Sequence, residues 1–355
     1  MTYCKISTKE YKNLQKRGFN ITIVKYKYKR EYYEKRKKMI IWILVVLSVI
    51  LVGGYFAIGN YFYGMAINAH TSKSFLTGNN DSKKQKTLSK KEKERKEQNE
   101  AFMAQVKPTA SYVTSSDKLK LKLYAADYIQ KSKTNKWAIV VHGYGGQSSD
   151  MASWTRHFYN KGYNVVTPDL RGHGKSQGDY IGMGWNDRKD MLLWINTITQ
   201  RDPQAEIVLL GVSMGGATVM NTSGEKLPSN VKAIVEDCGY TSTGDVFTYQ
   251  LKQLFGLPKF PVLYAANTMT EIRAGYNIFK SSAIKQVAKS KTPMLFIHGD
   301  KDTFVPFKML EPLYNAAKVE KEKLVVHGAG HGESEKINPD LYWSHVWNFV
   351  GKYMS

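Results

Sequence analysis

A serine stands between glycines at the end of an apolar run. Residues 207–210 are all apolar, and Gly211-Val212-Ser213-Met214-Gly215 follows them directly. The pattern predicts a buried strand, a sharp turn carrying Ser213 and a helix that begins at once. The glycines are needed because a side chain there would collide with a neighbouring strand or helix when the serine takes a strained backbone conformation. A hydroxyl presented on such a turn can attack a carbonyl carbon.

A serine nucleophile needs a base to take its proton, an acid to orient that base, and hydrogen-bond donors for the oxyanion. The candidate base is His331, in a glycine-rich turn after the last predicted strand. The candidate acid is Asp302, which also follows a predicted strand, with Asp300 as its rival. Each has an ordinary alternative, because an isolated histidine is often a surface residue and an aspartate is common in turns.

The elements that must position these residues alternate along the chain from Pro108 onward. A hairpin is predicted first, followed by apolar strands separated by amphipathic helices, which indicates a mostly parallel sheet covered on both faces. Ser213, Asp302 and His331 each follow the carboxyl end of a strand, where the loops of an open α/β sheet converge on one crevice. The predicted strands are residues 110–113, 119–129, 137–142, 163–168, 206–212, 231–237, 293–298 and 323–327, and the predicted helices are 150–160, 185–200, 214–221, 307–317 and 340–353.

Four motifs make residues 108–355 resemble an α/β-hydrolase-fold serine hydrolase, similar to the branch of serine aminopeptidases, monoacylglycerol lipases and related esterases. The chain order Ser213, Asp302, His331 is the order of that fold. The motifs are the Gly-x-Ser-x-Gly turn, His142-Gly143-Tyr144-Gly145-Gly146, residues 169–176 as D-x-R-G-H-G-x-S, and residues 299–306 as G-x-x-D-x-x-V-P.

The resemblance assigns a role to each motif. It selects Asp302 over Asp300, and it makes the backbone N–H groups of Tyr144 and Met214 the oxyanion donors. It also makes His142 and His173 structural. A cap over the site is implied at about residues 240–291, an insert rich in aromatic residues that alternatively packs onto its own core. No metal-ligand cluster or phosphate-binding glycine loop is recognisable in the sequence, so neither a metal nor a cofactor is expected.

A second feature lies near the N-terminus. Residues 39–58 contain no charged residue, and about 20 apolar residues suffice to span a membrane. A buried core helix and a cleaved signal peptide are the alternatives, but the run is long and its 38-residue leader exceeds that of a signal peptide. Lys35-Arg36-Lys37-Lys38 directly before the run predicts a cytoplasmic N-terminus and an extracellular remainder, as in a single-pass signal anchor of a bacterial cell membrane.

The remaining segments are polar. Residues 1–38 are predicted to be a basic cytoplasmic tail, either solvated or attracted to anionic lipids, and residues 59–107 a polar linker or stalk. The net charge of +22 suggests nucleic acid, but about two-thirds of the excess lies before Ala101, so no nucleic-acid partner is expected. Cys4 and Cys238 fall on opposite sides of the predicted membrane and are not expected to pair.

The sequence therefore predicts a membrane-anchored serine hydrolase that cleaves a carboxylic ester through an acyl-enzyme. A peptidase or amidase acting on small peptides is the alternative within the enzymes, because the same residues cleave amides. A non-catalytic binding or sensor domain that keeps the fold is the alternative from another class. The acyl group, the leaving group and the oligomeric state are not specified by the sequence.

Overall fold

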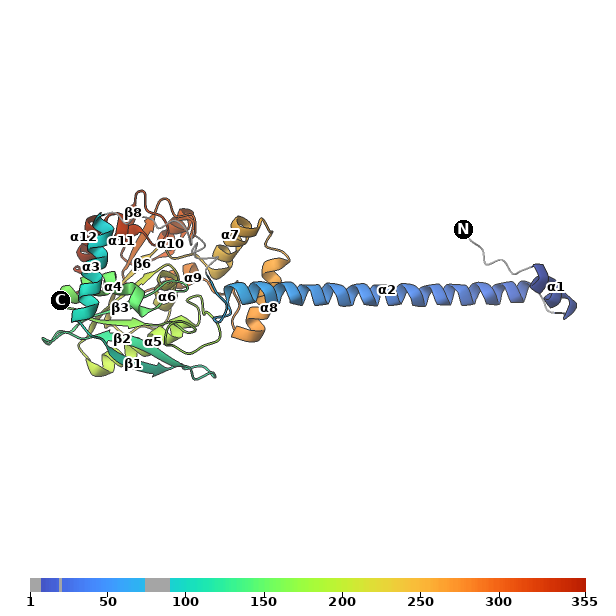
Figure 1. Ribbon diagram of the computed structural model, residues 1–355, viewed down its shortest axis with the longest axis horizontal. Helices are drawn as coiled ribbons and strands as arrows, with labels where there is room; N and C mark the ends of the chain where they lie inside the picture. The colour runs from blue at the N-terminus through green and yellow to red at the C-terminus, as the bar shows by residue number, and fades with distance from the viewer. Residues whose placement is uncertain (1–7, 19–20, 74–89) are drawn as a thin grey trace. The chain divides into compact units, whose positions relative to one another are not determined.

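The computed structural model describes residues 8–18, 21–73 and 90–355, and it divides into two compact units, Met1–Ala57 and Ile58–Ser355 (Figure 1). The first unit contains α1 (Thr8–Lys16) and most of α2 (Ile21–Ala66). The second contains the last turns of α2 and everything after it. Cys4 and the basic residues 83–89 lie outside the described residues.

An eight-stranded sheet forms the centre of the second unit, in the order β1-β2-β4-β3-β5-β6-β7-β8. β2 is antiparallel to both of its neighbours, and the strands from β4 to β8 are parallel to one another. The sheet confirms the predicted α/β-hydrolase architecture. The strands are β1 (Thr109–Thr114), β2 (Lys122–Tyr128), β3 (Lys136–Val141), β4 (Asn164–Pro168), β5 (Glu206–Val212), β6 (Val231–Asp237), β7 (Met294–Gly299) and β8 (Lys321–Val326).

Both faces of the sheet are covered, so the central strands are apolar at nearly every position rather than at every second one. In β3, Ile139 and Val141 face one core cluster, while Ala138 and Val140 face the other. The first cluster includes side chains of α5 (Asp187–Arg201), α6 (Met214–Ser223) and α10 (Leu310–Ala316), and the second includes side chains of α4 (Ala152–Asn160) and α12 (Pro339–Val350).

The predicted elements differ from the observed ones mainly at their ends. Residues 119–121 precede β2 rather than belonging to it, and β8 begins two residues earlier than predicted. The insert at 240–291, where the alternation of strands and helices lapses, contains three helices: α7 (Thr243–Phe255), α8 (Val262–Ala274) and α9 (Ala283–Val287). Short helical segments also occur at Ser148–Met151, Phe307–Met309 and Ser334–Ile337.

The range predicted as a linker, 59–107, is packed against the sheet unit at two places. Tyr63 and Ile67 at the end of α2 are only 4% and 2% exposed and belong to the core. Helix α3 (Lys90–Gln105) buries Phe102 against Tyr128, with ring centroids 5.8 Å apart. Phe102 and the partly buried Met103 and Val106 suffice to hold this segment against the core, and the polar average composition of the helix hides so small a contact.

Helix α2 confirms that the N-terminal apolar run is helical. From Lys29 to Ala66 it is long and apolar enough, by length and composition, to cross a membrane, and its most apolar stretch is not buried by protein. A signal sequence has the same properties. The structure therefore establishes an N-terminal helix that is long and apolar enough to span a membrane.

Candidate active site

Ser213 lies at the junction of β5 and α6 with φ 58° and ψ −116°, a conformation that L-residues rarely adopt. The glycines around it are sterically required. A Cβ on Gly211 would lie 2.1 Å from the carbonyl oxygen of Gly215, and a Cβ on Gly215 would lie 2.1 Å from that of Val141. Close packing of the turn against α6 and β3 thus leaves no room for side chains, as the motif predicts.

The structure brings Ser213, His331 and Asp302 together from the ends of β5, β8 and β7. His331 Nε2 is 2.8 Å from Ser213 Oγ, and His331 Nδ1 is 2.7 Å from Asp302 Oδ2. In this arrangement Nδ1–H donates to the carboxylate, which leaves Nε2 as the acceptor for the serine hydroxyl proton.

Asp302 is held as an anion by its surroundings. Burial alone would raise its pKa, but hydrogen bonds from His298 and His331 outweigh burial and lower the pKa to about 2. Its Oδ1 also accepts the backbone N–H groups of Phe304 and Val305, both at 2.9 Å. The carboxylate is therefore both charged and fixed in orientation.

The rival Asp300 has a different environment. Its Oδ2 lies 3.0 Å from His327 Nδ1, and its Oδ1 accepts the N–H of Gly328 at 2.7 Å. These bonds close the turn after β8, and it is Asp302 that contacts His331. Of the two aspartates, Asp302 is the one within hydrogen-bond distance of His331.

The segment expected to supply oxyanion donors passes directly beside Ser213. A Cβ on Gly143 would lie 3.3 Å from Ser213 Cβ and 3.7 Å from its Oγ. Among the hydrogen bonds of the described residues, neither the N–H of Tyr144 nor that of Met214 donates to a protein acceptor. Both groups are therefore available to a ligand, and Met214 is the first residue of α6, where the helix dipole favours negative charge.

The other two histidines support this loop. His142 Nε2 accepts the N–H of Leu170 at 3.0 Å, and His173 Nε2 accepts the N–H of Gly145 at 3.2 Å. Burial and the neighbouring His173 lower the pKa of His142 to about 4, so this imidazole stays neutral. Both imidazole rings thus position the backbone by accepting hydrogen bonds from backbone N–H groups.

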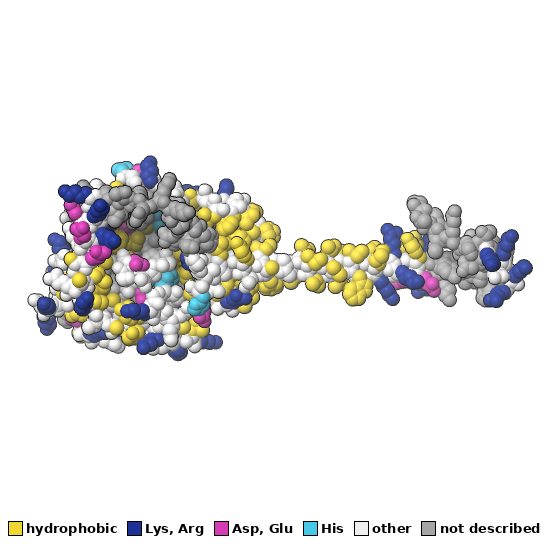
Figure 2. All heavy atoms as spheres, viewed as in Figure 1, with side chains coloured by type: hydrophobic (Ala, Val, Ile, Leu, Met, Phe, Trp, Pro, Cys, Tyr) yellow, Lys and Arg dark blue, Asp and Glu magenta, His cyan; other side chains and the backbone are white. Residues whose placement is uncertain are grey.

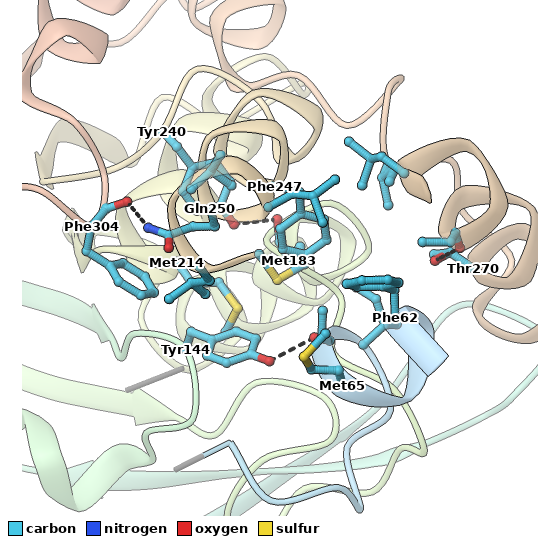
Figure 3. A pocket seen from close by; sticks show the side chains of 18 of the residues that line it. Phe62, Met65, Tyr144, Met183, Met214, Tyr240, Phe247, Gln250, Thr270 and Phe304 are labelled. Carbon is cyan, nitrogen blue, oxygen red and sulfur yellow. Dashed lines mark hydrogen bonds between the residues drawn. The ribbon is translucent and has the colours of Figure 1, made fainter. Parts of the chain in front are cut away.

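Ser213 is among the residues that line a largely apolar pocket of about 870 Å³, its open mouth included. Figure 3 shows this pocket from close by. The insert supplies much of its wall, including Phe247, Leu251 and Leu263, and Phe304 lies beside His331. The lining residues include no charged side chain. Residues of the insert therefore line the same pocket as Ser213.

One group of three potential metal ligands occurs in the described part of the chain: Cys238, Asp302 and His331, with ligand atoms within 4.8 Å of one another. Burial raises the pKa of the Cys238 thiol well above its ordinary value, so it stays protonated. Metals bind the thiolate. Because Asp302 and His331 also bind each other, this group does not fit a metal ion.

Two features of the site escaped sequence reasoning. His298 Nε2 lies 3.2 Å from Asp302 Oδ2, behind the carboxylate, and its spacing of four residues before Asp302 was the available signal. Phe62, Met65, Ala66 and Ile67 line the pocket from the end of α2. No spacing rule links that segment to the site.

Two models of known protein families match parts of the second unit. A family model for serine aminopeptidase, S33, matches residues 132–244, and one for serine hydrolase (FSH1) matches residues 210–332. The uncharacterized protein YqkD of Bacillus subtilis is 24% identical over 247 residues, which cover 69% of this chain and 80% of that protein.

Solved structures share the fold. The esterase Pf2001 of Pyrococcus furiosus superposes with a TM-score of 0.57 at 21% identity, covering 71% of this chain and 93% of that one. Est1E of Butyrivibrio proteoclasticus, solved with ferulic acid bound, gives 0.53 at 19% identity, covering 68% and 99%. With the sheet order described above, the chain has the α/β-hydrolase fold, and residues 132–332 match models of two serine hydrolase families, the serine aminopeptidases and FSH1.

Proposed function

We propose that the chain is a membrane-anchored hydrolase that cleaves carboxylic esters with Ser213 as nucleophile, His331 as general base and acid, and Asp302 as the residue that orients His331. The observation that carries the proposal is the pair of hydrogen bonds of 2.8 Å and 2.7 Å that His331 makes to the other two side chains.

In the first step Ser213 Oγ attacks the ester carbonyl carbon while His331 Nε2 takes the hydroxyl proton. The N–H groups of Tyr144 and Met214 stabilise the oxyanion, and a donor of this kind contributes about 3 kcal/mol in comparable enzymes. The protonated imidazole then gives its proton to the departing alkoxide, which leaves an acyl-serine. Water, deprotonated by His331, attacks that acyl group and releases the carboxylic acid.

The pocket favours an ester over the peptide alternative. A peptidase that acts at a free N-terminus must accommodate a substrate ammonium close to the scissile bond, and a desolvated ammonium needs a counter-charge. The residues lining the pocket include no aspartate or glutamate. An apolar acyl group suits this lining better than a charged amine.

The conformation of Ser213 argues against a non-catalytic binding domain. A non-glycine residue at φ 58° outside the usual regions costs free energy, of order 1–3 kcal/mol. This strain has a purpose in a hydrolase, because it directs the Ser213 hydroxyl toward His331. A binding surface gains nothing from it.

The test uses the full chain in detergent and a Ser213→Ala variant, both treated with a fluorophosphonate probe and then assayed on p-nitrophenyl esters and aminoacyl amides. We expect labelling and ester cleavage by the native chain only. If the folded native chain takes no label, the enzyme proposal fails, and if it cleaves the amides in preference, the peptidase alternative replaces it.

We further propose that residues 39–58 are a retained anchor, with residues 1–38 in the cytoplasm and residues 108–355 outside the cell. Burial of Tyr63 and Ile67 in the hydrolase unit supports retention, because the end of the same helix is part of the folded domain. An impermeant maleimide should label a Lys118→Cys variant, made together with Cys4→Ser, on intact cells. Labelling only after lysis would show the opposite orientation.

A further inference from the structure

One wall of the pocket comes from the end of the N-terminal helix. Phe62, Met65, Ala66 and Ile67 line it, and Figure 3 shows Phe62 and Met65 on the same side of the space as Tyr144. The Phe62 ring packs edge-on against Phe255 of α7, with centroids 5.5 Å apart. The helix end and the insert therefore enclose the space together.

This helix end is firmly held within the second unit. The carbonyls of Met65, in its last turn, and of Asn68, two residues beyond it, accept hydrogen bonds from Lys73 Nζ at 2.8 Å and 2.7 Å. A cation at the carboxyl end of a helix is also favoured by the helix dipole. The carbonyl of Ile67 accepts the N–H of Ile181 at 2.8 Å. These contacts hold the pocket wall formed by the end of α2 in a fixed position, which a flexible linker would not do.

The same end is bonded to the segment that carries a proposed oxyanion donor. Tyr144 donates its hydroxyl to the carbonyl of Ala66 at 2.8 Å. A little earlier, Gly59 allows α2 and α8 to touch, since a Cβ there would lie 2.5 Å from the carbonyl oxygen of Ala265. The position of Tyr144 and the width of the pocket thus both depend on the end of α2.

The polar side chains of the pocket are turned to backbone acceptors. Tyr240 donates to the Met183 carbonyl at 3.0 Å, and Gln250 donates to the Phe304 carbonyl at 2.5 Å. Thr270 donates to the carbonyl of Ala266 at 2.8 Å. With these groups satisfied, the surface left for a substrate beside Ser213 is hydrocarbon.

The wall begins close to the end of the apolar run. Phe62 is four residues after Ile58 on one continuous helix, so the two are about 6 Å apart along its axis. The insert also exposes apolar side chains, which Figure 2 shows gathered over one end of the hydrolase unit. They include Leu254, Phe260, Tyr264 and Ile272, at 44%, 70%, 45% and 65% exposure. An apolar surface of this kind suits the interface of the bilayer that holds the anchor.

We propose that residues 62–67 are part of the active site, where they form the wall against which a long acyl chain packs, and that the substrate is a long-chain acyl ester taken from the membrane. The proposal rests on the ester hydrolase function above and assigns its acyl group. Phe62 and Met65 become specificity-determining residues, and the end of α2 becomes a component of the pocket.

The test compares p-nitrophenyl butyrate with p-nitrophenyl palmitate in phosphatidylcholine vesicles that contain the full chain. Each methylene buried in the pocket should raise kcat/KM about fourfold until the pocket is filled. Phe62→Trp reduces the space for the acyl chain, so kcat/KM on palmitate should fall about tenfold or more relative to kcat/KM on butyrate.

Tyr61→Trp is the matched control, since Tyr61 is the neighbouring aromatic residue and is 63% exposed. It should leave the ratio of the two rates unchanged. If Phe62→Trp does not fold, Met65→Phe can be used instead, because it narrows the pocket at the same wall by a smaller change in side-chain volume. Equal effects of the wall variants on both esters, or a native preference for butyrate, would overturn the proposal. Absence of fluorophosphonate labelling in the native chain would instead overturn the hydrolase function itself.

A third variant tests the membrane source of the substrate. Ile272→Glu places a charge on the exposed apolar surface of α8, away from Ser213. We expect slower cleavage of palmitate ester held in vesicles and unchanged cleavage of butyrate in water. Equal vesicle rates for this variant and the native chain would show that the substrate does not enter from the bilayer.

Discussion

Replacement of Asp302 by asparagine tests the tautomer of His331 directly. In the native chain Asp302 Oδ1 accepts two backbone N–H groups, from Phe304 and Val305, and Oδ2 faces His331. An asparagine must keep its carbonyl oxygen on the two N–H donors. Its NH₂ group then points at His331 Nδ1, which can bind it only as an acceptor.

The consequence is an imidazole with its proton on the wrong nitrogen. With Nδ1 accepting, Nε2 carries the hydrogen and cannot take the proton of Ser213. The same replacement in a serine protease triad lowers kcat by about 10⁴-fold, or about 5.5 kcal/mol of barrier. We expect a loss of this size for Asp302→Asn, with little change in KM.

The assay is steady-state ester hydrolysis by the full chain, alongside thermal unfolding to show that the variant is folded. Asp300→Asn is the matched control, because the Asp300 side chain bonds to His327 and Gly328, whereas Asp302 is the aspartate bonded to His331. It should retain activity within about threefold, since a turn contact contributes little to the transition state. Activity of folded Asp302→Asn within about tenfold of native would refute the tautomer argument.

Two further changes probe the surroundings of the site. Gly215→Ala puts a Cβ 2.1 Å from the Val141 carbonyl oxygen, so the melting temperature should fall by an amount equivalent to at least about 2 kcal/mol, measured by differential scanning fluorimetry. Glu236→Gln should reduce the pH dependence of the free energy of unfolding. Burial raises the pKa of Glu236 to about 8 in the folded chain, so the folded state is stabilised by holding this carboxyl group protonated. That stabilisation is complete below about pH 4.5, the pKa in the unfolded chain, and is lost as pH rises to 8. In urea unfolding measured across that pH window, the free energy of unfolding of the variant should rise relative to that of the native chain by about 1.4 kcal/mol per pH unit.

Each variant has a control that distinguishes its predicted effect from general destabilisation of the fold. Gly64→Ala meets no atom within 4 Å and lies in a helix, so it should be neutral or stabilising. An equal loss in both glycine variants would contradict the steric argument. For Glu236, the Gly239 N–H that its carboxylate accepts at 2.9 Å can be kept by the glutamine oxygen. A stability difference that does not change with pH would show that the carboxyl group is not protonated in the native state.

The sequence predicted the parts of the site whose chemistry demands a fixed local pattern. The turn at Ser213 tolerates only glycine at Gly211 and Gly215, because backbone atoms of adjacent elements lie 2.1 Å from the missing Cβ positions. Buried parallel strands likewise leave continuous apolar runs that can be located. Asp302 was separable from Asp300 only through the resemblance to a family, since two turn aspartates two residues apart look alike until their partners are known.

The end of α2 shows why the remainder could not be predicted. A side chain such as Phe62 contributes to the pocket through contacts with α7, almost two hundred residues away in sequence, and apolar residues beside a membrane span are expected for interfacial reasons alone. The observations that distinguish the two roles are tertiary: burial of Tyr63 and Ile67, and the bond from Tyr144 to the Ala66 carbonyl. The end of α2 therefore lines the pocket from four residues after the apolar run, so a change of length or sequence just after that run should alter substrate preference.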